Sequence, residues 1–126
     1  MKIVETSKGV KPLGPYSQAV SSNGFIFVSG TVGIDPGTGK VVAGGIREQT
    51  KQALENIKVV LEEGGSSLDS VTKAGVFIKE ASFFKDMNEV YATYFSKHKP
   101  ARTTVVTGFA REDILVEIDI VATTSM

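Results

Sequence analysis

The sequence predicts an α+β fold in which a mixed six-stranded sheet carries two helices on one face. Short segments with apolar and polar residues in alternation, and two longer segments with helical periodicity, follow one another in the order ββ-α-β-α-ββ. A helix between two parallel strands makes a right-handed crossover, so both helices should cover the same face. At 126 residues the chain suits one hydrophobic core, and we expect residues 1–126 to form a single domain.

The chain is expected to open with a β-hairpin. Its strands are residues 17–20 and 25–29, and the turn between them ends in Asn23-Gly24, a pair that readily adopts positive φ angles. The Gly-rich stretch 35–45 is interpreted as a long loop. Further strands are predicted at residues 71–79, 102–107 and 115–123, so these patterns place five of the six strands.

Two amphipathic helices are expected between the strands. The first begins at Ile46 and ends at two glycines, residues 64–65, with apolar positions spaced by three and four. The second should begin after an N-cap, Ser82, and run to about His98, ahead of Pro100. Its predicted buried stripe consists of Phe84, Met87, Tyr91, Tyr94 and Phe95.

The sheet face opposite the helices is predicted to be partly apolar. In the last strand, Val116, Ile118 and Ile120 point one way, while Leu115, Glu117, Asp119 and Val121 point the other. In an early strand, Phe25 and Phe27 lie opposite Ile26 and Val28. Two helices cover one face only, so we expect another copy of the chain to bury the second face in a homo-oligomer.

Composition excludes several classes of function. Fourteen Lys and Arg balance fourteen Asp and Glu, so the net charge does not favour nucleic acid. No cysteine and a single histidine, His98, leave no disulfide, thiol nucleophile or zinc cluster. The N-terminus lacks a secretory h-region and no apolar run approaches the roughly 20 residues that span a bilayer, so a cytoplasmic protein without membrane contact is expected.

Arg102 and Glu117 are the candidate reactive groups. Arg102 opens one predicted strand, and Glu117 lies fifteen residues later inside the apolar run ILVEIDIVA. On adjacent antiparallel strands, this cation and acid would frame a small anionic substrate and the water that attacks it. The alternative is a structural ion pair of Arg102 with Asp119 or Glu117 across the strands.

Six segments resemble, in order and over essentially the whole chain, the reactive intermediate deaminases of the Rid family, also called YjgF or L-PSP. They are GPYSQA at 14–19, FVSG at 27–30, DPGTG at 35–39, MNEVYATYF at 87–95, PART at 100–103 and VEIDIVA at 116–122. The resemblance implies a chorismate-mutase-like fold and a homotrimer with clefts between subunits. It also implies hydrolysis of 2-imino acids, or their enamine tautomers, to 2-keto acids and ammonia, for which no metal or cofactor is needed because the imine is already reactive.

The resemblance assigns roles to individual residues. Arg102 matches the family's carboxylate-binding arginine, and Glu117 matches its water-positioning glutamate. The other implied substrate-binding residues are Tyr16, Ser29, Gly30, Asn88 and Thr104. Thr104 replaces the family's frequent cysteine, Thr31 replaces its glutamine, and segment 108–113 lacks its Leu-Pro turn, which leaves the substrate preference open.

Simpler roles exist for three of these residues. Asn88 at the apolar edge of its helix commonly bonds to the backbone of a neighbouring loop. Tyr16 is otherwise a packing aromatic, and Ser29 is expected to act through its backbone N–H rather than its hydroxyl.

Three functions are compatible with these residues. The leading one is an imine deaminase acting on a small 2-imino acid. The second, an RNA-directed translation inhibitor or endoribonuclease, is disfavoured because the chain offers one histidine and zero net charge. The third is an oligomer that binds a small ligand without turnover.

Overall fold

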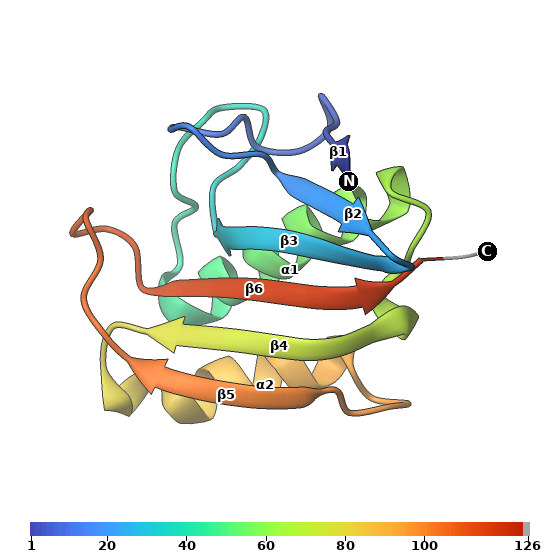
Figure 1. Ribbon diagram of the computed structural model, residues 1–126. Helices are drawn as coiled ribbons and strands as arrows, with labels where there is room; N and C mark the ends of the chain where they lie inside the picture. The colour runs from blue at the N-terminus through green and yellow to red at the C-terminus, as the bar shows by residue number, and fades with distance from the viewer. Residues whose placement is uncertain (125–126) are drawn as a thin grey trace.

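The computed structural model describes residues 1–124 and shows a single mixed sheet backed by two helices. The strand order is β1-β2-β3-β6-β4-β5, and Figure 1 shows both helices behind the sheet, which leaves the front face open. The strands are β1 (Lys2–Val4), β2 (Ala19–Ser22), β3 (Phe25–Val32), β4 (Val71–Ile78), β5 (Ala101–Val106) and β6 (Val116–Thr123). The helices are α1 (Gly45–Glu63) and α2 (Phe84–Tyr94), with short 3-10 turns at Leu68–Ser70 and Ala81–Phe83. The predicted fold class is therefore confirmed.

The N-terminal hairpin and one further strand lie at one edge of the sheet. Asn23 and Gly24 have φ angles of 53° and 84°, which confirms the predicted tight turn between β2 and β3. The strand that the sequence patterns did not place is β1, which pairs antiparallel with β2. Its three residues are too few to show a recognisable alternation.

The position of β6 corrects one prediction. β5 forms the far edge of the sheet and pairs in parallel only with β4, whereas β6 lies between β3 and β4. The strands that carry Arg102 and Glu117 were predicted to be adjacent. In the structure, β4 lies between them. A strand with apolar residues on both faces gains most at the centre of a sheet, and order along the chain does not reveal this insertion.

The core lies between the helices and the rear face of the sheet. The apolar positions of α1 are buried at Ile46, Ala53, Leu54, Ile57, Val60 and Leu61. In β3 and β6 the buried side of the predicted alternation consists of Ile26, Val28, Val116, Ile118 and Ile120. The predictions for α2 need correction. The helix ends at Tyr94 rather than His98, and the Ser82 hydroxyl donates to Glu80 at 3.4 Å instead of capping the helix. No helix within residues 1–124 is long and apolar enough to cross a membrane.

Only part of the predicted α2 stripe is buried. Met87, Tyr91 and Phe95 are buried, but Tyr94 is half-buried and Phe84 keeps 45% of its surface exposed. Phe84 stands at the start of the helix over Arg102 of the edge strand, and in the described part of the chain no further strand lies beyond β5 to cover it.

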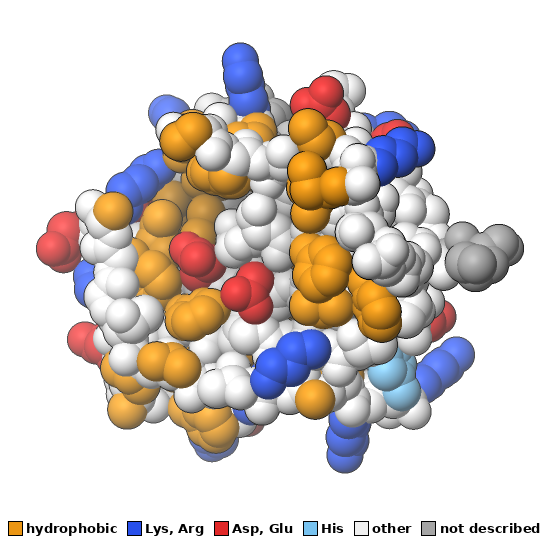
Figure 2. All heavy atoms as spheres, viewed as in Figure 1, with side chains coloured by type: hydrophobic (Ala, Val, Ile, Leu, Met, Phe, Trp, Pro, Cys, Tyr) orange, Lys and Arg blue, Asp and Glu red, His pale blue; other side chains and the backbone are white. Residues whose placement is uncertain are grey.

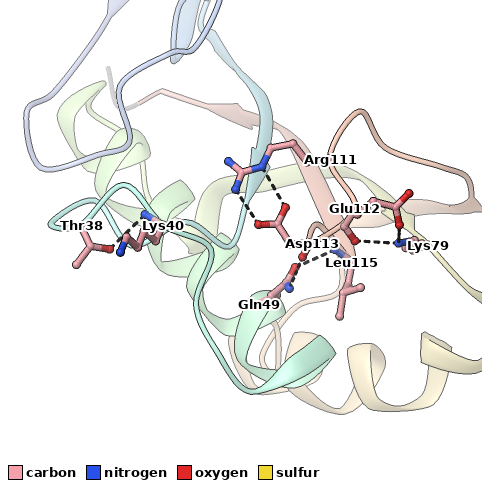
Figure 3. A network of polar contacts seen from close by, with 8 residues as sticks. All are labelled: Thr38, Lys40, Gln49, Lys79, Arg111, Glu112, Asp113 and Leu115. Carbon is pink, nitrogen blue, oxygen red and sulfur yellow. Dashed lines mark hydrogen bonds and ion pairs between the residues drawn. The ribbon is translucent and has the colours of Figure 1, made fainter.

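The loop between β5 and β6 is held in place by a polar network (Figure 3). The buried amide of Gln49 on α1 donates to Asp113 O and accepts from Leu115 N, both at 2.9 Å. Lys79 Nζ donates to Glu112 O at 2.8 Å, and Arg111 pairs with Asp113 at 2.7 Å. These bonds hold the segment that leads into β6, the strand that carries Glu117.

Candidate active site

The open face of the sheet combines acidic and aromatic side chains. Glu117 and Asp119 of β6 are half-buried there, and Phe25 and Phe27 of β3 remain 41% and 43% exposed. Figure 2 shows acidic groups in the middle of this face with hydrophobic groups around them. Isolated exposed apolar residues are ordinary, but several on one sheet face mark a surface that another molecule covers.

A β-bulge brings the backbone of β3 against Glu117. Val28 pairs with Ile120 and Thr31 with Ile118, so β3 contains one extra residue in this stretch. A Cβ atom added to Gly30 would clash with the carboxylate of Glu117, reaching 2.8 Å from its Cδ. Only glycine leaves room for the carboxylate at this position.

The electrostatic surroundings of Glu117 favour a base. Partial burial raises its pKa, and the neighbouring Asp119 carboxylate raises the pKa further. Within residues 1–124, no hydrogen bond is donated to the Glu117 carboxylate by another side chain or backbone group. A carboxylate with a raised pKa and free oxygens is suited to accept a proton from water.

Ser29 and Tyr16 lie next to Gly30, at the wall of a small cavity. The Ser29 hydroxyl donates to Ser17 O at 2.6 Å, and its backbone N–H donates to Gln18 O at 3.0 Å. The Ser29 N–H is therefore occupied, contrary to the expected role, and its hydroxyl oxygen remains as an acceptor. Tyr16 is 52% exposed, so it is not a packing aromatic of the core. Together with Gly30 they line a cavity of about 70 Å³ under residues 10–13.

Arg102 lies on the opposite face of the sheet from Glu117. It pairs with Ala74, whose side chain is fully buried under the helices, whereas Glu117 pairs with Phe77 on the open side. Side chains of paired residues share a face, so one chain does not bring the two candidate reactive groups together. Within residues 1–124, Arg102 forms no ion pair, so the alternative of a structural pair with Asp119 or Glu117 is also wrong.

Two aromatic rings lie against Arg102, and the two elements that meet there carry unsatisfied polar atoms. Its guanidinium carbon lies 4.8 Å from the centre of the Tyr91 ring and 5.8 Å from that of Phe84. In the described part of the chain, three buried polar atoms have no hydrogen-bond partner: Asn88 Oδ1, Tyr91 OH and Thr104 Oγ1. Such atoms are rare in native proteins, and each calls for an explanation. Asn88 Oδ1 thus lacks the loop contact suggested as its simpler role.

These three residues belong to the same corner of the fold as Arg102. Thr104 follows Arg102 by two residues on β5 and shares its face, while Asn88 precedes Tyr91 by three on α2. Sequence reasoning had placed Tyr91 and Phe84 only in the core stripe. Their spacing of seven residues puts both rings on one helix face, which is also the pattern of a core stripe, so the sequence does not distinguish the two roles.

The chain therefore carries two separate half-sites. The basic half-site, at the edge formed by β5 and α2, consists of Arg102, Asn88 and Thr104. The acidic half-site, on the open face, consists of Glu117 with Gly30 against its carboxylate. Gly30 also lines the neighbouring cavity together with Ser29 and Tyr16. Within residues 1–124, no three His, Cys, Asp or Glu side chains are grouped so as to hold a metal ion.

Comparison with known proteins gives consistent matches over the whole chain. A family model described as Endoribonuclease L-PSP matches residues 6–124. A RutC family protein of Pyrococcus abyssi is 48% identical over 121 residues, which cover 96% of this chain and 95% of the relative. The chloroplastic Reactive Intermediate Deaminase A of Arabidopsis thaliana is 38% identical over 122 residues, covering 97% of this chain and 65% of the relative.

Solved structures share the fold closely. A crystal structure from Thermotoga maritima superposes with a TM-score of 0.94 at 44% identity, covering 100% of this chain and 99% of the other. The structure of Escherichia coli TdcF with bound serine gives a TM-score of 0.92 at 33% identity, covering 99% and 100%.

Proposed function

Because the chain belongs to the Endoribonuclease L-PSP family, the Rid family identified from its sequence motifs, we propose that it hydrolyses 2-imino acids and their enamine tautomers to 2-keto acids and ammonia. The observation that carries this proposal is that Arg102 forms no ion pair within residues 1–124, while the strand and helix that meet at it carry buried polar atoms that lack hydrogen bonds there. A free guanidinium is the group that binds a small carboxylate bidentately.

We propose further that the active site forms between two subunits of a homotrimer. Arg102 and Glu117 lie on opposite faces of one sheet, so a substrate that contacts both requires the basic half-site of one subunit and the acidic half-site of its neighbour. The exposed Phe25 and Phe27 on the same sheet face as Glu117, and the exposed Phe84 beside Arg102, support burial of both regions by another copy.

The proposed chemistry begins with placement of the substrate. Arg102 holds the carboxylate, which fixes the adjacent C=N carbon. Glu117 aligns a water molecule and takes one of its protons as the oxygen bonds to that carbon, while the C=N electron pair moves to nitrogen, which is protonated. The resulting carbinolamine loses ammonia with the C–N electron pair after a second proton reaches nitrogen, and loss of the hydroxyl proton leaves the 2-keto acid.

The raised pKa of Glu117 suits both proton transfers. As a carboxylate it accepts the proton of water more readily than an unperturbed glutamate, and as the acid it returns that proton to nitrogen. Ser29 Oγ and the backbone at Thr104 are proposed to contact the nitrogen or the nascent hydroxyl, and Asn88 and Tyr16 to line the cleft.

The decisive test is acceleration of imine hydrolysis. An amino-acid oxidase generates 2-iminobutanoate in situ, and its disappearance is followed with the wild type, Arg102→Ala and Glu117→Gln. We expect near-complete loss for Arg102→Ala and a loss of about 10²–10⁴-fold for Glu117→Gln. Lys58→Ala and Glu62→Gln are controls from the exposed side of α1, away from both half-sites, and should retain activity. Equal rates with and without the wild-type protein would remove the deaminase proposal.

A non-catalytic ligand-binding oligomer is the second candidate, since a relative has been crystallised with serine. Binding of serine or a 2-keto acid without any acceleration of hydrolysis would favour it. RNA cleavage ranks below both, because the chain's one histidine, His98, is engaged through Nε2 with Val71 O at 3.2 Å. Metal-independent RNA cleavage that Glu117→Gln abolishes would restore it.

A further inference from the structure

Within residues 1–124, the guanidinium of Arg102 contacts aromatic rings and forms no ion pair with an acidic side chain. Its guanidinium carbon lies within 6 Å of two ring centres, at 4.8 Å from Tyr91 and 5.8 Å from Phe84, which is the range of a cation–π interaction. Both rings belong to α2, one near its first turn and one two turns later. The arginine comes from the facing edge strand, so helix and strand together define where its side chain lies.

A contact with an aromatic ring leaves an arginine side chain in a different state from an ion pair with a carboxylate. A carboxylate partner would occupy the N–H donors of the guanidinium and neutralise its charge, whereas a ring contacts the flat face and leaves the in-plane donors unoccupied. Arg102 thus contacts two rings and, within residues 1–124, forms no ion pair that would occupy its N–H donors. This is the state in which a planar anion binds with least reorganisation.

Tyr91 acts as a ring and not as a counter-charge. Burial raises the pKa of its phenol, although Arg102 opposes that effect, so the side chain stays neutral at physiological pH. Its hydroxyl has no hydrogen-bond partner among the described residues, so core packing fixes the ring. The ring is 8% exposed and lies against Phe95 with a centroid separation of 4.7 Å.

We propose that Phe84 and Tyr91 form an aromatic platform that positions Arg102 to receive the carboxylate of the substrate. Both are positioning residues that act through Arg102. The inference rests on the proposed function and deepens it, because a platform of this kind demands a ligand with a planar anion and gives no advantage to a neutral analogue. It also gives a role to Phe84, whose ring lies at the edge of the sheet beside Arg102.

Titration with 2-ketobutanoate, the stable keto acid product, tests the platform directly. Tyr91→Leu should raise the Kd about fivefold to thirtyfold, the loss of one partly desolvated cation–π contact, and Phe84→Leu about twofold to fivefold. Tyr91→Phe keeps the ring and should stay within about twofold of the wild type. The neutral 2-ketobutanamide should bind weakly and equally to all of these proteins.

The same region supplies matched controls. Tyr94 is half-buried with its hydroxyl bonded to Glu55 at 2.8 Å, and Phe83 packs on the core next to Phe84 in the sequence. The rings that lie under the Arg102 guanidinium are those of Tyr91 and Phe84, so Tyr94→Leu and Phe83→Leu should bind 2-ketobutanoate like the wild type even if they lower the melting temperature. An equal loss of affinity in Tyr94→Leu would reduce the effect to general destabilisation and overturn the proposal.

A second readout does not depend on any ligand. In NMR spectra of protein with labelled arginine, the side-chain protons of Arg102 should be shifted upfield by the rings, and Tyr91→Leu should remove this shift while Tyr91→Phe keeps it. An unchanged spectrum or an unchanged Kd in Tyr91→Leu overturns the platform. If Tyr91→Leu fails to fold, Phe84→Leu at the half-exposed position provides the test, through the same measurements of Kd and of the Arg102 NMR signals. If the platform variants lose keto acid affinity as predicted but the wild type does not hydrolyse imines, the proposed function is refuted and the platform is not.

Discussion

If each site takes one half from each of two subunits, as proposed, mixing two inactive variants of this chain is expected to restore about one quarter of wild-type activity. Arg102→Ala destroys the basic half-site and Glu117→Gln the acidic one. Since the two residues lie on opposite faces of the sheet, a complete site arises wherever an intact Arg102 meets an intact Glu117 from its neighbour. In a random one-to-one mixture each half is intact with probability one half, and the product of the two is about one quarter.

The experiment requires subunit exchange and a count of subunits. The variants carry different affinity tags, are mixed by joint refolding, and are checked by native mass spectrometry before the hydrolysis of 2-iminobutanoate is measured. A chain with both substitutions, mixed one-to-one with wild type, gives an independent figure. Relative to the same total amount of pure wild-type protein, sites between subunits predict about one quarter of the activity. Sites within one subunit predict about one half. Proven hetero-oligomers without recovered activity would refute the reasoning.

Individual contacts lead to further expected outcomes. Gly30→Ala should lower kcat about tenfold to a hundredfold, because its Cβ would displace the Glu117 carboxylate, and a crystal structure of the variant should show that displacement. Asp119→Asn removes a like charge and lowers the raised pKa of Glu117, so the acid limb of the pH–rate profile should move to lower pH; an unmoved limb would show that another group titrates. The raised pKa also means that the neutral form of Glu117 stabilises the fold at low pH and that this contribution is lost as pH rises through the folded-state pKa. Glu117→Gln should therefore unfold at higher urea concentration than the wild type at pH 7 but not at pH 3. Gln49→Leu leaves two backbone groups of the β5–β6 loop unsatisfied and should cost about 2–4 kcal/mol in urea unfolding, whereas Gln52→Leu, which removes only a bond to the Asn56 side chain, should cost less.

Local patterns in the sequence determined most of the fold. Helical spacing identified the buried face of α1, Asn23-Gly24 identified the hairpin turn, and the alternation in β6 separated Ile118 from Glu117 correctly. These features depend on interactions between residues close along the chain or on the constant periods of helix and strand, so sequence suffices for them. The motifs also sufficed to identify the family.

The placement of Arg102 was decided only by the tertiary structure. Nothing in the order of the strands along the chain reveals that β6 inserts between β3 and β4, which puts Arg102 two strands away from Glu117, and the pairing register puts the two on opposite faces. The placement of Phe84 was likewise decided only by the tertiary structure. Its position in the helix resembles that of a core residue, but its ring lies by Arg102 of the edge strand β5. Periodicity determines which residues share a face, whereas strand order, and with it which faces meet, is determined by the packing of the whole chain.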